Sequence, residues 1–206
     1  MLKSELIDDI DYVKNLAETG RNAPLLGGRI GIWWGILLSI TLFSHWCILT
    51  GVVHLHEMYF GVLWIVFAIV GTIGTIILSR KLGNKPGVSS VNNRVAAALW
   101  MGNTILLFSF GTVAGISAAL GINDFDIMNL MSPLAFGLYG LTAYVLAQIS
   151  GVKLHLFVAL IGIGFMALTI FLLHSPNLFL AAILGVICTI IIPDVIFIRN
   201  EPKPIE

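Results

Sequence analysis

Apolar and polar residues follow one another along this chain in long blocks, and these blocks predict its architecture. Each apolar block has at least the roughly 20 residues with which an α-helix crosses the hydrocarbon core of a bilayer. The third block is longer and is expected to tilt or protrude. The six blocks cover residues 29–50, 58–79, 94–120, 131–150, 153–174 and 177–198. The pattern therefore predicts an all-α polytopic membrane protein, with a bundle of six transmembrane helices over residues 29–198.

Residues 1–28 form a polar block with a helical period. One apolar stripe recurs at spacings of three and four residues, formed by Leu2, Leu6, Ile10, Val13 and Ala17. The spacing predicts a short amphipathic helix, and the connector that follows contains Pro24, which prevents continuation into the first span.

Composition agrees with membrane insertion. The chain of 206 residues is 58% hydrophobic and 11% charged, with a mean hydropathy of +0.98. Soluble domains carry about a quarter charged residues. No polar stretch is long enough to form a separate soluble domain, so the bilayer itself is the first expected partner.

The distribution of cations predicts the orientation. Counting crossings places all 11 Lys and Arg residues on one side, and the three loops on the other side (51–57, 121–129 and 175–177) contain none. Because Lys and Arg are enriched in cytoplasmic segments, both termini are expected in the cytoplasm, including the tail 199–206. The spans then pair as three hairpins in a plasma membrane or bacterial inner membrane. Topology explains the basic residues, so no nucleic acid partner is expected.

The N-terminal helix is acidic, with five acids against two bases before residue 20. Helices that lie on anionic lipid are usually basic, so we expect this helix to dock on protein through Leu6, Ile10 and Val13. The partner is either the chain's own basic loop, residues 80–94, or a separate cytoplasmic protein. The alternative is a solvated helix that covers the base of the bundle.

Small residues mark the expected packing faces. The first span has a stripe of Gly28, Gly31, Gly35 and Ser39, and the third has Gly111 and Gly115 in a G-x-x-x-G motif. Small side chains let membrane helices approach closely. The same stripes would equally suit a homo-oligomer.

The middles of all six blocks lack Asp, Glu, Lys and Arg. One acid, Asp194, follows Pro193 toward the inner end of the last span and is a candidate ion or proton site. The alternative is a helix-end carboxylate paired with Arg29, Arg94 or Arg199.

Histidines and acids gather in the outer loops. His54, His56, Glu57 and His174 form a candidate metal site, because imidazole and carboxylate groups bind zinc and similar ions. The alternative is a set of solvated residues at the membrane interface. His155, at the opposite boundary, is also expected to be interfacial.

No catalytic motif is present: the chain lacks G-x-S-x-G, paired intramembrane aspartates and a phosphate-binding loop. We therefore expect neither an enzyme nor a cofactor. The favoured function is an accessory or regulatory membrane subunit that acts through its N-terminal helix. The alternative is a small transporter or channel, for a metal ion or for an uncharged solute that passes Asn103 and Thr104.

Overall fold

The computed structural model describes residues 25–56, 58–83, 85 and 87–199, and all regular structure in this part of the chain is helical. The elements are α2 (Gly28–Leu49), α3 (Met58–Leu82), α4 (Val91–Ala119), the 3₁₀ helix η1 (Phe125–Leu130), α5 (Met131–Ser150), α6 (Lys153–Phe171), α7 (Asn177–Val186), the π-helical turn η2 (Ile187–Ile191) and α8 (Ile192–Arg199). Six helical segments are long and apolar enough to cross a membrane, and the last of them combines α7, η2 and α8. The predicted all-helical chain with six spans is confirmed.

Helix ends differ from the predicted ends by a few residues, for local reasons. Helix α4 begins at Val91 rather than 94 because Ser90 caps it, its hydroxyl oxygen accepting from the backbone N–H of Asn93 at 3.3 Å. Helix α6 ends at Phe171 rather than 174, and a tight turn precedes α7, closed by a 2.8 Å bond from the N–H of Ser175 to the carbonyl of Leu172.

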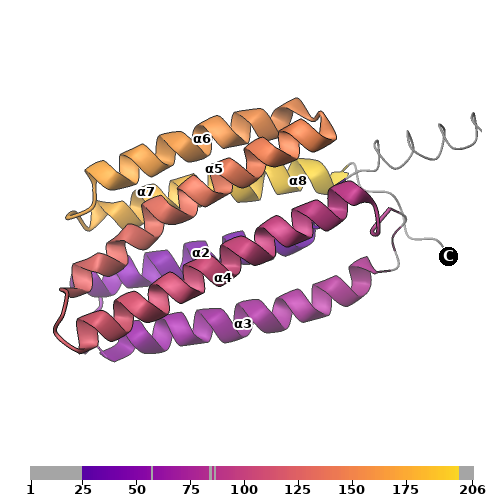
Figure 1. Cartoon of the computed structure of the whole chain (residues 1–206). Coiled ribbons are helices and arrows are strands. Elements are labelled where there is room, and N and C mark those ends of the chain that lie inside the picture. Colours follow the sequence, from indigo (N-terminus) through magenta and orange to yellow (C-terminus); the bar gives the residue numbers. More distant parts are fainter. Residues whose placement is uncertain (1–24, 57, 84, 86, 200–206) are drawn as a thin grey trace, which may run out of the picture.

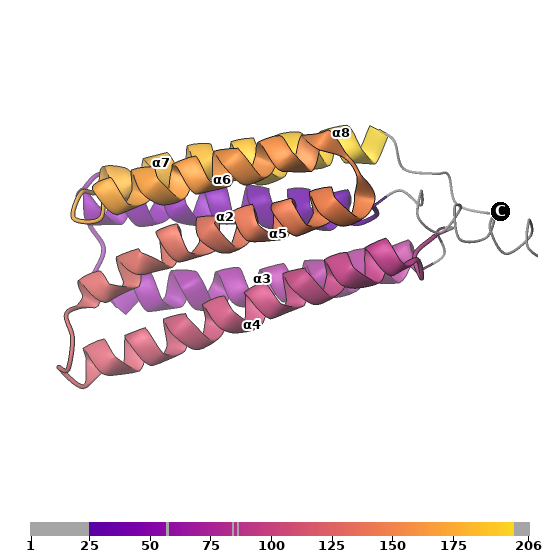
Figure 2. The same cartoon turned by 45° about the horizontal axis from the view of Figure 1, so that its top comes forward.

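Successive spans run in opposite directions, as Figure 1 shows. Helices α3 and α4 lie on one side of the bundle and α6, α7 and α8 on the other, with α2 and α5 between them (Figures 1 and 2). The most extensive helix contact is between α5 and α6, while α3 packs principally on α2, and α4 on α5 and η1. Helices α3 and α4 are therefore peripheral.

The core lies where α2, α5 and the last span meet. Its buried side chains are Leu42, Phe136, Leu178, Phe179, Ala182, Val186 and Ile190. Close approach of α5 and α6 depends on Gly140 and Gly162, since a methyl group at Gly162 would lie 3.1 Å from the Cα of Gly140. Glycines thus act as packing surfaces within the chain.

Two tryptophans of α2 attach α3. The six-membered ring of Trp34 lies over Gly71, and its Nε1–H donates to the hydroxyl of Thr75 at 2.8 Å. Trp33 lies over Gly74 and donates to the carbonyl of Gly71 at 3.3 Å. These two indoles are helix-packing groups.

Candidate functional site

The last span is interrupted by a π-helical turn, and its cause is local. Pro193 has no N–H with which to bond the preceding turn. The N–H of Ile192 reaches back five residues to the carbonyl of Ile187. The hydroxyl of Thr189 donates to the carbonyl of Gly185 at 2.7 Å. Such π turns are frequent at functional sites, and this one places Asp194 in the first turn of α8.

Asp194 lies against the glycine stripe of α2. A methyl group at Gly31 would overlap the carboxylate of Asp194, and one at Gly28 would lie 2.9 Å from its backbone carbonyl oxygen. The stripe predicted as a packing face therefore receives the candidate ion or proton site, and Asp194 is half-buried there. The alternative, a helix-end carboxylate paired with Arg29, Arg94 or Arg199, stays a prediction.

Asn93 ties the start of α2 to the loop before α4. Its Oδ1 accepts from the backbone N–H of Leu26 at 2.7 Å, and its Nδ2 donates to the carbonyl of Gly87 at 2.9 Å and to the hydroxyl of Ser90 at 3.1 Å. The prediction from sequence missed this residue. The available signal was Ser90 followed three residues later by an amide, a spacing typical of a capped helix start.

His155, which was expected at the membrane boundary, is buried against a neighbouring helix. Only 5% of its surface is exposed, and its ring meets that of Phe197 edge-on at 4.5 Å. Its Nε2 has no hydrogen-bond partner in the described part of the chain. His155 is buried because α8 approaches the first turn of α6. Sequence spacing does not reveal this contact.

The histidines of the candidate metal site occupy separate places. His54 and His56 are exposed in the loop after α2, whereas His174 lies in the turn after α6, with its Nδ1 3.8 Å from Oδ2 of Asp126. Both members of that pair are highly exposed. The described residues contain no group of three or more His, Cys, Asp or Glu that could hold a metal. Glu57 lies outside the described residues, so the metal site stays a prediction.

His45 lies in an aromatic enclosure near the same end. Its ring stacks on Phe179 at 4.2 Å and contacts Phe60 at 4.4 Å. The indole Nε1–H of Trp64 donates to Nδ1 of His45 at 3.1 Å. Because Nδ1 accepts this bond, the neutral imidazole carries its proton on Nε2. His45 is thus a structural hydrogen-bond acceptor in the α2–α3 contact.

The polar residues suggested for solute passage do not share a face. Asn103 is buried and donates to the hydroxyl of Thr142 at 2.8 Å, joining α4 to α5. Thr104 is exposed, and its hydroxyl donates to the carbonyl of Trp100 in its own helix.

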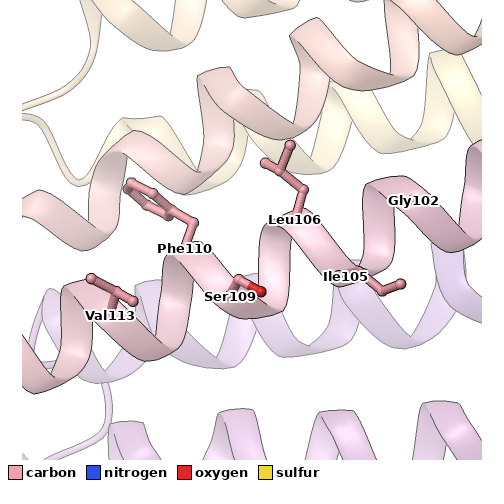
Figure 3. A pocket seen from close by; sticks show the side chains of 6 residues that line it. All are labelled: Gly102, Ile105, Leu106, Ser109, Phe110 and Val113. Carbon is pink, nitrogen blue, oxygen red and sulfur yellow. The ribbon is translucent and has the colours of Figure 1, made fainter.

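The outer face of α4 carries a shallow groove (Figure 3). Its lining residues all come from α4: Gly102, Ile105, Leu106, Ser109, Phe110 and Val113. Ser109 is exposed there, and its hydroxyl makes no hydrogen bond within the described residues. The predicted docking residues Leu6, Ile10 and Val13 lie outside the described part of the chain.

Comparisons with protein-family models, with curated protein sequences and with solved structures give no match to this chain. The class of protein is therefore assigned from the fold alone. Six apolar helices of spanning length make the chain an integral membrane protein of the helical-bundle class, in contact with the lipid bilayer.

Proposed function

We propose that this chain is a non-enzymatic accessory or regulatory subunit that binds another membrane protein through the outer face of α4. One observation carries the proposal. Helix α4 is the longest span and has the lowest mean hydropathy, yet only 11% of its apolar segment is buried, whereas the most hydrophobic span, the last, is 39% buried. A helix that faces lipid is expected to be strongly apolar. We therefore expect another protein, rather than lipid, to contact the exposed face of α4.

The groove on α4 suits a partner helix. An unpaired hydroxyl is unfavourable in hydrocarbon, and Ser109 presents one on this face. The neighbouring hydroxyls of Thr104 and Thr112 are satisfied by carbonyls of their own helix. With Gly102 allowing close approach, a partner that offers a hydrogen-bonding side chain would fill the groove.

Two further parts of the proposal rest on sequence pattern. The acidic N-terminal helix would add a second contact through Leu6, Ile10 and Val13, and the Lys and Arg distribution favours cytoplasmic termini.

The orientation is tested with single reporter cysteines in the loops at the two ends of α3. Gly51 and Gly87 have positive φ angles, which a cysteine would strain, so the cysteines are placed at the exposed neighbours Val52 and Ser89. An impermeant thiol reagent added outside cells should label the Val52→Cys protein alone, and labelling of Ser89→Cys instead would reverse the orientation.

The contact is tested with Gly102→Leu, which fills the groove. The matched control is Gly164→Leu, at an exposed glycine of α6 where a side chain also meets open space. Tagged full-length proteins are gently solubilised from native membranes and examined by native mass spectrometry. The parent and the control should retain a partner subunit that Gly102→Leu loses. Retention by all three proteins refutes the α4 contact, and a parent that carries only copies of itself refutes the accessory-subunit function.

A second candidate, cation or proton transport, is favoured by the interrupted last span. Broken helices line ion sites in many transporters, and here the break places the Asp194 carboxylate against Gly31. The test is cation and proton flux in proteoliposomes. Asp194→Asn should abolish flux and Asp194→Glu should retain part of it, and absence of flux with the parent protein excludes this function.

A further inference from the structure

The end of the bundle that carries the α3–α4 loop is strongly cationic. The described cations are Arg29, Arg80, Lys81, Lys85, Arg94, Lys153 and Arg199. All belong to helix termini or loops at this end, and Asp194 is the acid that the structure describes beside them.

Contacts between helices place the chain segments that carry four of these cations side by side. In spatial order the four are Arg94, Arg29, Arg199 and Lys153, and together they are called the arc. Arg94 follows Asn93, whose Oδ1 accepts from the N–H of Leu26, three residues before Arg29. Next along the arc, Gly28 packs on Ile198, since a methyl group at Gly28 would lie 3.0 Å from a side-chain carbon of Ile198. This contact brings together the turns of α2 and α8 that carry Arg29 and Arg199.

The arc continues from α8 to α6. The ring of Phe197 meets that of His155 at 4.5 Å, so the end of α8 that carries Arg199 lies beside the start of α6, where Lys153 is located. All four side chains are exposed, and none forms an ion pair or hydrogen bond with a residue that the structure describes. Helices α4, α2, α8 and α6 thus each contribute one exposed cation.

The position of the arc relative to the bilayer indicates its ligand. Arg29 is in the first turn of α2, Lys153 begins α6 and Arg199 ends α8. A 22-residue helix such as α2 is about 33 Å long, close to the thickness of the hydrocarbon core. The cations at these helix ends therefore lie at the level of lipid phosphates. Basic sites between transmembrane helices are suited to anionic headgroups.

We propose that Arg94, Arg29, Arg199 and Lys153 form a binding site for the phosphate headgroup of an anionic phospholipid. The acidic segment before residue 25 is a weaker occupant: its five acids and three bases leave a net charge of −2. Docking of that segment would not neutralise this end. The lipid site requires only that this end lies among headgroups, so it is independent of the partner on α4.

The test uses the full-length protein in mixed micelles with equal amounts of phosphatidylglycerol and phosphatidylcholine. Native mass spectrometry counts the retained lipids. The parent should retain phosphatidylglycerol preferentially, and Arg29→Gln with Arg199→Gln should weaken its binding about 25-fold, because each cation near an anionic surface contributes roughly fivefold. Arg29→Lys with Arg199→Lys keeps the charge and should keep the lipid. This second variant keeps the proposal testable if the Gln variant fails to fold.

The matched control removes two cations outside the arc, Arg80→Gln with Lys81→Gln on α3, and should retain the lipid. Equal losses in the control and the arc variant overturn the proposal, since diffuse charge would then explain binding. Binding of inorganic phosphate as tight as that of phosphatidylglycerol also overturns it. A parent that retains no phosphatidylglycerol, and that gains it when residues 1–20 are deleted, assigns the arc to the N-terminal segment instead.

Discussion

Substitution of Gly71 by Ala tests how α3 is attached to the bundle. The added methyl group would overlap the six-membered ring of Trp34. That ring cannot move aside freely, because its Nε1–H is bonded to Thr75 at 2.8 Å and its edge contacts Phe67 at a centroid distance of 5.3 Å. Since α3 packs principally on α2, a displaced indole weakens the main attachment of α3.

The magnitude follows from the geometry. Overpacking of a well-packed site costs about 1–3 kcal/mol, which is roughly a 5- to 150-fold change in an equilibrium constant. Replacing glycine by alanine in a helix also adds up to about 1 kcal/mol of favourable helix propensity. Gly61→Ala in the same helix controls for that gain, because a methyl group there meets no atom within 4 Å. The difference between the two variants therefore isolates the overlap with Trp34.

The assay is reversible unfolding of the purified proteins in mixed micelles with increasing sodium dodecyl sulfate. Gly71→Ala should unfold at lower detergent fraction than Gly61→Ala, with a free energy of unfolding smaller by about 1–3 kcal/mol. Adding Trp34→Phe, which removes the overlapping ring, should recover part of that loss. Equal free energies for the two alanine variants would refute the packing of Trp34 on Gly71.

Two further predictions concern buried polar contacts. A double-mutant cycle with Asn103→Leu and Thr142→Val should give a coupling free energy of about 0.6–1.7 kcal/mol, as interhelical hydrogen bonds in membranes do, and additive effects would contradict the 2.8 Å bond. Asn93→Ala removes the acceptor of the Leu26 N–H and should speed hydrogen exchange at that amide about 2- to 10-fold; an unchanged exchange rate would show that the connector is held by other groups.

Hydropathy predicted the spans because each segment meets the bilayer separately, so length and composition suffice. The interruption of the last span also has a local cause, since Pro193 acts on its own helix through its missing N–H. Residues 187–191 adopt a π turn rather than a simple kink. The turn packs against α2, where a methyl group at Gly35 would lie 2.7 Å from a side-chain carbon of Ile191.

Contacts between distant segments could not be predicted, because periodicity shows that a face exists and not what covers it. The stripe that contains Gly31 was recognised, but its partner Asp194 was not. His155 illustrates the same limit: it was assigned to the interface from its place in the chain, and α8 covers it. Sequence gave no reason to separate His174 from the loop histidines His54 and His56, because loop proximity depends on helix packing.

The pairing of the α2 glycines with α8 also has a consequence for biosynthesis. Gly31 and Asp194 are 163 positions apart, so the ribosome must add all of the residues between them before α2 can meet its partner. At 5–20 residues per second this delay is roughly 8 to 30 s. During that interval the glycine stripe of α2 faces lipid or the insertion machinery. A nascent chain arrested before residue 185 should therefore be the form that membrane chaperones hold longest.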